Sequence, residues 1–128
     1  MTPTEIPDEA RLLVERRIAS VEMLDVLLLV HDSPGRAWTA AEAARALGTS
    51  EVSASAQLVA LRQSGILSVA MADDARYTYG PRPDLAAAVD ALAAHFRDHP
   101  LDVADLIRSR PRQKLRMFAD AFRLRKDE

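Results

Sequence analysis

Three residues in the C-terminal half of the chain have the types and spacing of metal ligands. His95 and His99 are four residues apart, a spacing that places two imidazoles on one face of a helix, and Asp102 follows shortly after them. Pro100 interrupts the helix directly after His99, however, and no third ligand has a favourable position. A histidine in the last turn of a helix is also stabilised by the helix dipole. We therefore expect neither a metal site nor a cofactor.

Other catalytic arrangements are equally weak. The chain has no cysteine and only four glycines, and it contains neither a glycine-rich phosphate loop nor a Ser-His-Asp set with a nucleophile turn. The adjacent carboxylates Asp73 and Asp74 fall in a turn and are typical of a solvated tip rather than an acid–base pair. No apolar run approaches the roughly 20 residues that a membrane span needs. We expect a protein of the cytoplasm that is not an enzyme and does not contact a membrane.

Charge is distributed unevenly along the sequence. Residues 108–128 hold eight lysines and arginines against three acidic residues, a net charge of +5. Because the whole chain has a net charge of −2, the first 107 residues have a net charge of −7. A basic segment on an acidic body is typical of contact with nucleic acid or with an acidic partner. The alternative is a solvated amphipathic helix whose charges neutralise its own body. The sequence leaves both interpretations open.

The elements that would position a binding site are clearest in the middle of the chain. Thr39 and Glu42 have the spacing of a capping box, which predicts a helix that begins at residue 40. Gly48 follows the last apolar position of that helix and is a natural left-handed stop. Ser50 then offers a second N-cap, and Gly65 ends the second helix. Two short helices joined by a tight turn with glycine form a helix-turn-helix.

A small β-hairpin is predicted directly after this unit. Residues 66–71 form a short β-rich run, residues 72–75 a turn, and residues 76–79 a second strand. Residues 36–38 could add a third strand, and Trp38 is expected to fill the gap between the small sheet and the preceding helix. The predicted fold class is mainly α with a small β-wing, a winged helix-turn-helix core with flanking helices at both ends.

The segment from residue 20 to residue 80, about half of the chain, resembles the winged-helix regulators of bacteria, most closely the MarR-like group. The resemblance rests on Leu47-Gly48, Ser50, Gly65 and Ile66-Leu67. It implies a transcriptional regulator that binds double-stranded DNA and forms a homodimer through helices outside the winged core. It also implies an effector pocket between the core and those helices, lined by Leu24, Trp38 or Phe96, although no ligand is indicated.

Flanking segments complete the predicted organisation. Residues 1–7 form a loose arm, residues 8–80 the winged core with its N-terminal helices, and residues 81–128 a helical extension of the same domain. The expected helices span 8–20, with Leu12, Leu13, Ile18 and Ala19 buried; 21–31, capped by Ser20; 84–98, capped by Asp84; 101–108; and a last one from Pro111. The apolar stripes of the extension either pair across a dimer or fold back onto the first helix.

The second helix of the helix-turn-helix would be the DNA-reading one. On a helical wheel Ala54, Leu58 and Leu61 fall together and face the core. In the DNA-binding interpretation, the side chains at or near the groove are Ser50, Ser53, Ser55 and Gln57. The side chains that contact phosphates are Arg45, Arg62 and Arg76.

A protein-interaction module is the alternative. The outward helix face is largely small and apolar, and the wing tip carries two carboxylates where a phosphate would lie. In this interpretation a dry patch meets a partner, and the basic segment meets an acidic protein. The residues of the patch are Val52, Ala56, Val59 and Gln63. Those of the basic segment are Arg112, Lys114, Arg116, Arg123 and Arg125.

Overall fold

A computed structural model describes residues 6–109 of the chain. The fold is mainly α with a small two-stranded β-wing, as the sequence predicts. The elements in chain order are α1 (Asp8–Arg17), α2 (Val21–His31), α3 (Ala40–Leu47), α4 (Glu51–Gln63), β1 (Leu67–Met71), β2 (Ala75–Tyr79) and α5 (Pro83–Asp98). Residues 100–109 are also helical.

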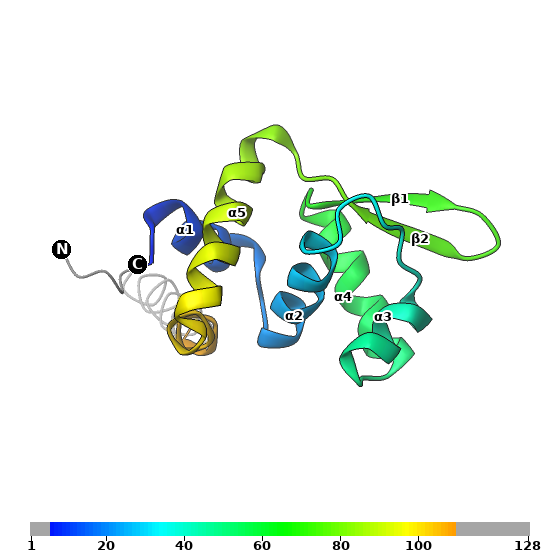
Figure 1. The fold of residues 1–128 in the computed structure, drawn as a ribbon, viewed down its shortest axis with the longest axis horizontal. Coiled ribbons are helices and arrows are strands. Elements are labelled where there is room, and N and C mark those ends of the chain that lie inside the picture. The colour runs from blue at the N-terminus through cyan, green and yellow to red at the C-terminus, as the bar shows by residue number, and fades with distance from the viewer. Residues whose placement is uncertain (1–5, 110–128) are drawn as a thin grey trace, which may run out of the picture.

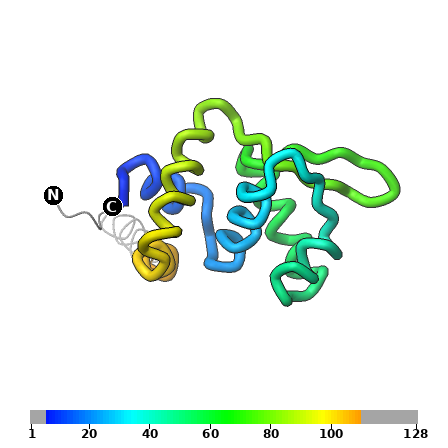
Figure 2. The backbone as a smooth tube through the Cα atoms, in the orientation of Figure 1, coloured from blue at the N-terminus to red at the C-terminus, as the bar shows by residue number. Residues whose placement is uncertain are grey.

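The described chain has two ends with α2 and α4 between them. Helices α1 and α5 pack together at one end, with residues 100–109, and the β1–β2 hairpin projects from the other (Figure 1). The first and last described residues both lie at the α1–α5 end, away from the wing (Figure 2). The flanking segments therefore lie on one side of the winged core, away from α3 and the tip of the wing.

Local capping sets the geometry of the helix-turn-helix. The Thr39 hydroxyl accepts a hydrogen bond from the Glu42 backbone N–H at 3.2 Å, and the Glu42 carboxylate accepts one from the Thr39 N–H at 3.0 Å. Gly48 ends α3 at φ 68°, and the Ser50 hydroxyl caps α4 by accepting from Ser53 N–H. Because orphan N–H groups are satisfied at the start of both helices, the turn between them needs only three residues. The two N-caps predicted for the helix-turn-helix, Thr39 and Ser50, are confirmed.

The wing is an antiparallel hairpin whose paired residues run from Leu67 with Tyr79 to Met71 with Ala75. The third strand expected at residues 36–38 is reduced to a single bridge, in which Trp38 and Tyr77 exchange backbone hydrogen bonds of 2.7 and 2.8 Å. The Arg36 N–H closes the preceding turn, and the next N–H after Trp38 belongs to the α3 cap. These two donors are therefore not available to lengthen the strand.

One continuous hydrophobic core runs through the described residues. Helix α2 lies at its centre, and α4 contributes the three residues expected from the helical wheel, all fully buried. Trp38 is buried as predicted. The fully buried residues of α2, α4, the start of the wing and α5 include Leu24, Val26, Leu27, Val30, Ala54, Leu58, Leu61, Ile66, Val89 and Leu92.

The prediction for the first helix was partly wrong. Helix α1 ends at Arg17 rather than at residue 20, because Ile18 adopts extended backbone and Ser20 is used as the N-cap of α2. Leu12 is 46% exposed and Ala19 is exposed, whereas Ala10 and Val14 are buried. The buried face of α1 therefore follows positions 10, 13 and 14, which point toward α5.

Helix α5 also begins differently from the prediction. Pro83 occupies its first turn, where a missing N–H costs nothing, and the side chain of Asp84 makes no cap. Instead the Arg82 guanidinium donates two hydrogen bonds to the Asp84 carboxylate, at 2.8 and 3.1 Å. The apolar stripe of α5 packs on α1, so the fold-back alternative describes this helix. The helix expected from Pro111 lies outside the described residues.

Candidate functional site

The outward surface of α4 is the most exposed part of the helix-turn-helix. We define the α4 face as Val52, Ala56, Val59 and Gln63, all of which are exposed. Val52 is 82% and Val59 37% exposed. Its neighbours Ser55, Gln57 and Ala60 are half-buried. The four patch residues that the sequence singled out on this helix therefore share one surface, although their binding role stays a prediction.

Two of the serines expected near a DNA groove are engaged within the protein. The Ser53 hydroxyl donates a hydrogen bond to the Glu22 carboxylate of α2, which also accepts one from the Thr49 hydroxyl at 3.3 Å. The Ser50 hydroxyl is used as the cap of α4. Sequence reasoning missed Glu22, because no local pattern indicates that the first turn of α2 meets the start of α4. Ser55 and Gln57, both half-buried on α4, remain as the other polar groups of the expected groove set.

Three exposed arginines belong to the helix-turn-helix and the wing. Arg45 lies in the last turn of α3, Arg62 in the last turn of α4, and Arg76 on β2. A fourth, Arg36, lies over the Trp38 ring with its guanidinium carbon 3.6 Å from the ring centroid, a cation–π contact. These are the guanidinium groups that the described part of the helix-turn-helix and wing offers to an anion.

Part of this positive charge is already compensated. Hydrogen bonding from the backbone of Thr39, followed by its hydroxyl and by the charges of Arg36 and Arg76, holds the pKa of Glu42 below its usual value. The two arginines therefore have an acidic neighbour in the α3 cap. A duplex would compete with Glu42 for them.

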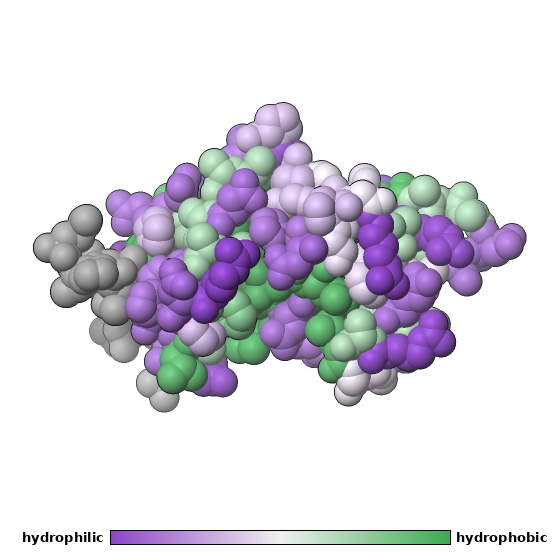
Figure 3. Space-filling view, in the orientation of Figure 1, coloured by the Kyte–Doolittle hydropathy of each residue, from purple (hydrophilic) through white to green (hydrophobic). Residues whose placement is uncertain are grey.

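Carboxylates also line the space between α4 and the wing. A hollow of about 200 Å³ lies among the starts of α3 and α4 and the wing. Glu51 and Asp74 are both on its wall, and Asp73 is exposed beside it. The far end of the wing is correspondingly hydrophilic in the space-filling view (Figure 3). A phosphate placed in this hollow would meet like charges, which oppose binding most strongly at low salt.

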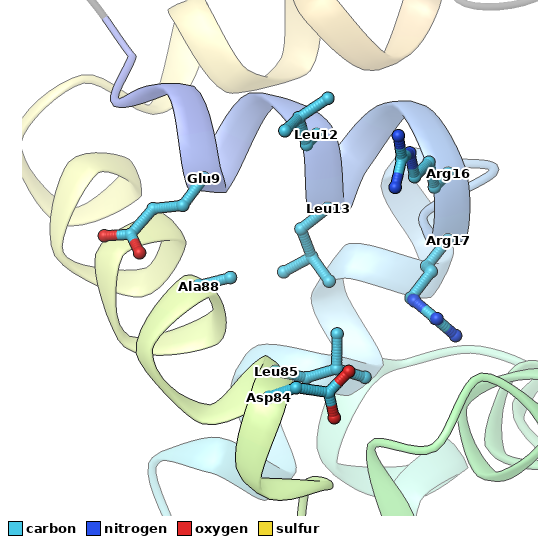
Figure 4. A pocket seen from close by; sticks show the side chains of 8 residues that line it. All are labelled: Glu9, Leu12, Leu13, Arg16, Arg17, Asp84, Leu85 and Ala88. Carbon is cyan, nitrogen blue, oxygen red and sulfur yellow. The ribbon is translucent and has the colours of Figure 1, made fainter.

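Two further hollows adjoin α5. The first, of about 260 Å³, lies between α1 and α5, where Leu13 points toward Leu85 and Ala88 and the charged side chains surround them (Figure 4). The second, of about 240 Å³, is lined by Phe96 with neighbours from α2 and α5. Of the three residues named for an effector pocket, only Phe96 lines a hollow here, since Leu24 and Trp38 are buried in the core.

The end of α4 is attached to both flanking segments. The Arg17 guanidinium of α1 donates a hydrogen bond of 2.7 Å to the Ser64 carbonyl. The Arg82 backbone N–H, just before α5, donates one of 2.8 Å to the Gly65 carbonyl. Gly65 has φ 82°, and a Cβ there would stand 2.6 Å from Arg82 Cδ. The segments before and after the winged core therefore meet at the C-terminal end of α4.

A set of three metal ligands is not formed by His95 of α5, His99 directly after that helix and Asp102. The His95 and His99 rings are 5.1 Å apart, and His95 Nε2 lies 3.7 Å from an Asp102 oxygen, beyond hydrogen-bond distance. Between residues 6 and 109, no group of three or more histidine, cysteine or acidic side chains is placed to hold a metal ion.

The basic segment falls almost wholly outside the described residues. Arg108 is its only described cation, 3.7 Å from Asp105 on the same helix. The predicted partner contacts that lie beyond residue 109 are Arg112, Lys114, Arg116, Arg123 and Arg125.

Comparison with protein-family models, with curated proteins and with solved structures gave no match. The protein is therefore classified by its fold alone, which is mainly α with a small β-wing. Among residues 6–109, no helix is both long and apolar enough to span a membrane.

Proposed function

We propose that this chain is a winged helix-turn-helix transcriptional regulator that binds double-stranded DNA as a homodimer, with α4 in the major groove. The observation that carries the proposal is the exposed α4 face, together with the exposed Arg45, Arg62 and Arg76 on α3, α4 and β2. Second helices of helix-turn-helix units use such a face to reach base edges, while surrounding cations contact phosphates. The MarR-like resemblance of residues 20–80 supports the same assignment.

In this function most contacts to bases would be apolar. Val52, Ala56 and Val59 fit thymine methyl groups, and Gln63 is the exposed amide of the α4 face. Each phosphate contact contributes about −0.9 to the slope of log affinity against log salt. Three arginines per protomer therefore give a contribution of about −3 from the winged core.

The test is a fluorescence-anisotropy titration of a labelled mixed-sequence duplex over a range of salt concentrations. Changing Arg45, Arg62 or Arg76 to alanine should weaken binding and make the slope shallower by about 0.9 for each protomer bound. Arg97→Ala, which removes an exposed arginine from α5, is the matched control and should leave the slope unchanged. Absence of binding even in low salt, or an equal effect of Arg97→Ala, would contradict DNA binding by this face.

A protein-interaction module is the second candidate, and the exposure of apolar side chains favours it. Val52 is 82% exposed on α4, and Met71 is 79% exposed on the wing. A centre depleted of charge with charged surroundings is typical of a protein interface. In this function the basic C-terminal segment would contact an acidic protein.

Val52→Asp distinguishes this second candidate. The side chain has almost no packing to lose, so the variant should fold normally but lose a partner that the wild-type protein retains on affinity resin. Ala94→Asp introduces the same charge at an exposed position of α5 and should retain it. Equal recovery with both variants would remove the α4 face from consideration as the contact surface.

A further inference from the structure

His31 is the point at which three separate elements meet. It is the last residue of α2, and its Nδ1 lies 3.0 Å from an Asp32 carboxylate oxygen directly after that helix. Its Nε2 lies 3.0 Å from a carboxylate oxygen of Asp90, in the middle of α5. The ring also stands edge-on to Tyr79, the last residue of β2, with centroids 5.1 Å apart and planes at 78°. The imidazole at the end of α2 therefore contacts the residue after its own helix, α5 and the wing.

The two carboxylates determine which form of the ring fits this site. A neutral imidazole carries one N–H, but a carboxylate only accepts hydrogen bonds. One ring nitrogen of neutral His31 would consequently turn its lone pair toward an acidic oxygen. The imidazolium donates from both nitrogens and satisfies both contacts, and its charge also complements the C-terminal end of α2.

We propose that protonated His31 is a latch that fastens α5 to the winged core through Asp90, and that loss of the proton releases it. Residues 80–82 alone separate β2 from α5 along the chain. When the latch is released, the contact between α5 and the end of α2 loses the ionic hydrogen bond between His31 and Asp90. This bond lies next to Tyr79, the last residue of β2. The inference concerns the described fold alone and does not depend on DNA binding.

The surroundings of the ring agree with a protonated state. Burial alone would lower the pKa of His31, but the hydrogen bonds to Asp32 and Asp90 and the two carboxylate charges raise it above the ordinary 6.5. Tyr79 does not titrate in the same range, because burial, and then the charge of Asp90, raise the pKa of its phenol to about 12. The nearby hollow that Phe96 lines is also lined by Asp32 and by Arg97 of α5. Arg97 is therefore a cation on the same side of the molecule as the Asp32 carboxylate.

The sign of the pH effect follows from the raised pKa. A proton that binds the folded protein more tightly stabilises the fold. The contribution of His31 is therefore complete below its unfolded pKa, near 6.5, and is lost as pH rises through the higher folded pKa. The latch is closed in mildly acidic solution and open in alkaline solution.

The first part of the test is an NMR titration of the histidine ring signals in the full chain. His31 should titrate with a midpoint above 6.5, and Asp90→Asn should lower that midpoint. Asp98→Asn, which neutralises an exposed carboxylate at the end of the same helix, is the matched control and should leave it unchanged. A wild-type midpoint at or below 6.5, or equal effects of the two asparagine variants, would overturn the proposal.

The second part measures the latch itself by amide hydrogen exchange, corrected for the intrinsic pH dependence of exchange. Protection of α5 relative to α4 should fall as pH crosses the His31 midpoint in the wild type, by about tenfold for each unit by which folding raises the pKa. In His31→Gln this ratio should be independent of pH. Because Asp90→Asn interrupts the same contact from α5, it gives a second variant if His31→Gln does not fold. A ratio that stays constant in the wild type would overturn the latch.

Discussion

Leu58→Ala is expected to lower the free energy of unfolding by roughly 2–5 kcal/mol, the usual loss for a leucine removed from a packed core. Leu58 is fully buried on the inner face of α4. It belongs to the single core shared with α2 and the start of the wing. Since domains of this size are stable by only about 5–15 kcal/mol, the variant loses a large part of its stability.

The adjacent residue supplies the control. Val59→Ala removes methyl groups from the exposed α4 face and should change the unfolding free energy by less than about 1 kcal/mol. Urea denaturation followed by circular dichroism measures both variants, with the denaturant slope confirming comparable unfolding transitions. Losses of similar size for the two substitutions would mean that α4 does not have the buried and exposed faces described.

Replacing both Asp73 and Asp74 with lysine should increase duplex affinity and steepen its salt dependence. Both carboxylates are exposed at the wing tip, and Asp74 lines the hollow between the wing and α4. Two added phosphate contacts make the slope steeper by about 1.8 for each wing bound. That corresponds to about tenfold more affinity lost when salt is raised from about 50 to about 200 mM.

Net charge must be separated from position in this experiment. Asp98→Lys with Asp105→Lys changes the charge by the same amount on the α1–α5 side of the molecule, where both residues are exposed. Salt-dependent anisotropy should show the large change only for the wing-tip variant. If both double variants gain equally, the effect is general attraction, and if neither changes, the wing does not touch the duplex.

The features that could be predicted from sequence are those fixed by local interactions. The capping box, the left-handed glycines and the Ser50 cap each involve residues within a few positions of one another, and all are present. The buried face of α4 follows from helical periodicity alone. The wing follows from two β-rich runs around a short turn. Together these are sufficient for the fold class.

The features that were missed depend on contacts between distant residues. The Glu22–Ser53 hydrogen bond joins residues 31 positions apart, and the His31–Asp90 contact joins residues 59 apart. No periodicity indicates either pairing. The start of α5 differs from the prediction for a local reason, because Asp84 satisfies the rules for a cap but its carboxylate is held by Arg82, two residues before it. The candidate site was therefore located from sequence, whereas the availability of its side chains was not.

The two hydrogen bonds at the end of α4 bear on whether the winged helix is a separable module. Carbonyls at this end accept from Arg17, before the winged core, and from Arg82, after it. Excising residues 20–80 would remove both donors and uncover the core side chains that α1 and α5 now bury. In evolutionary terms, we expect α4 and the segments on either side of it to be inherited together. A recombination event that exchanges the flanking helices would have to replace the docking groups at the end of α4 as well.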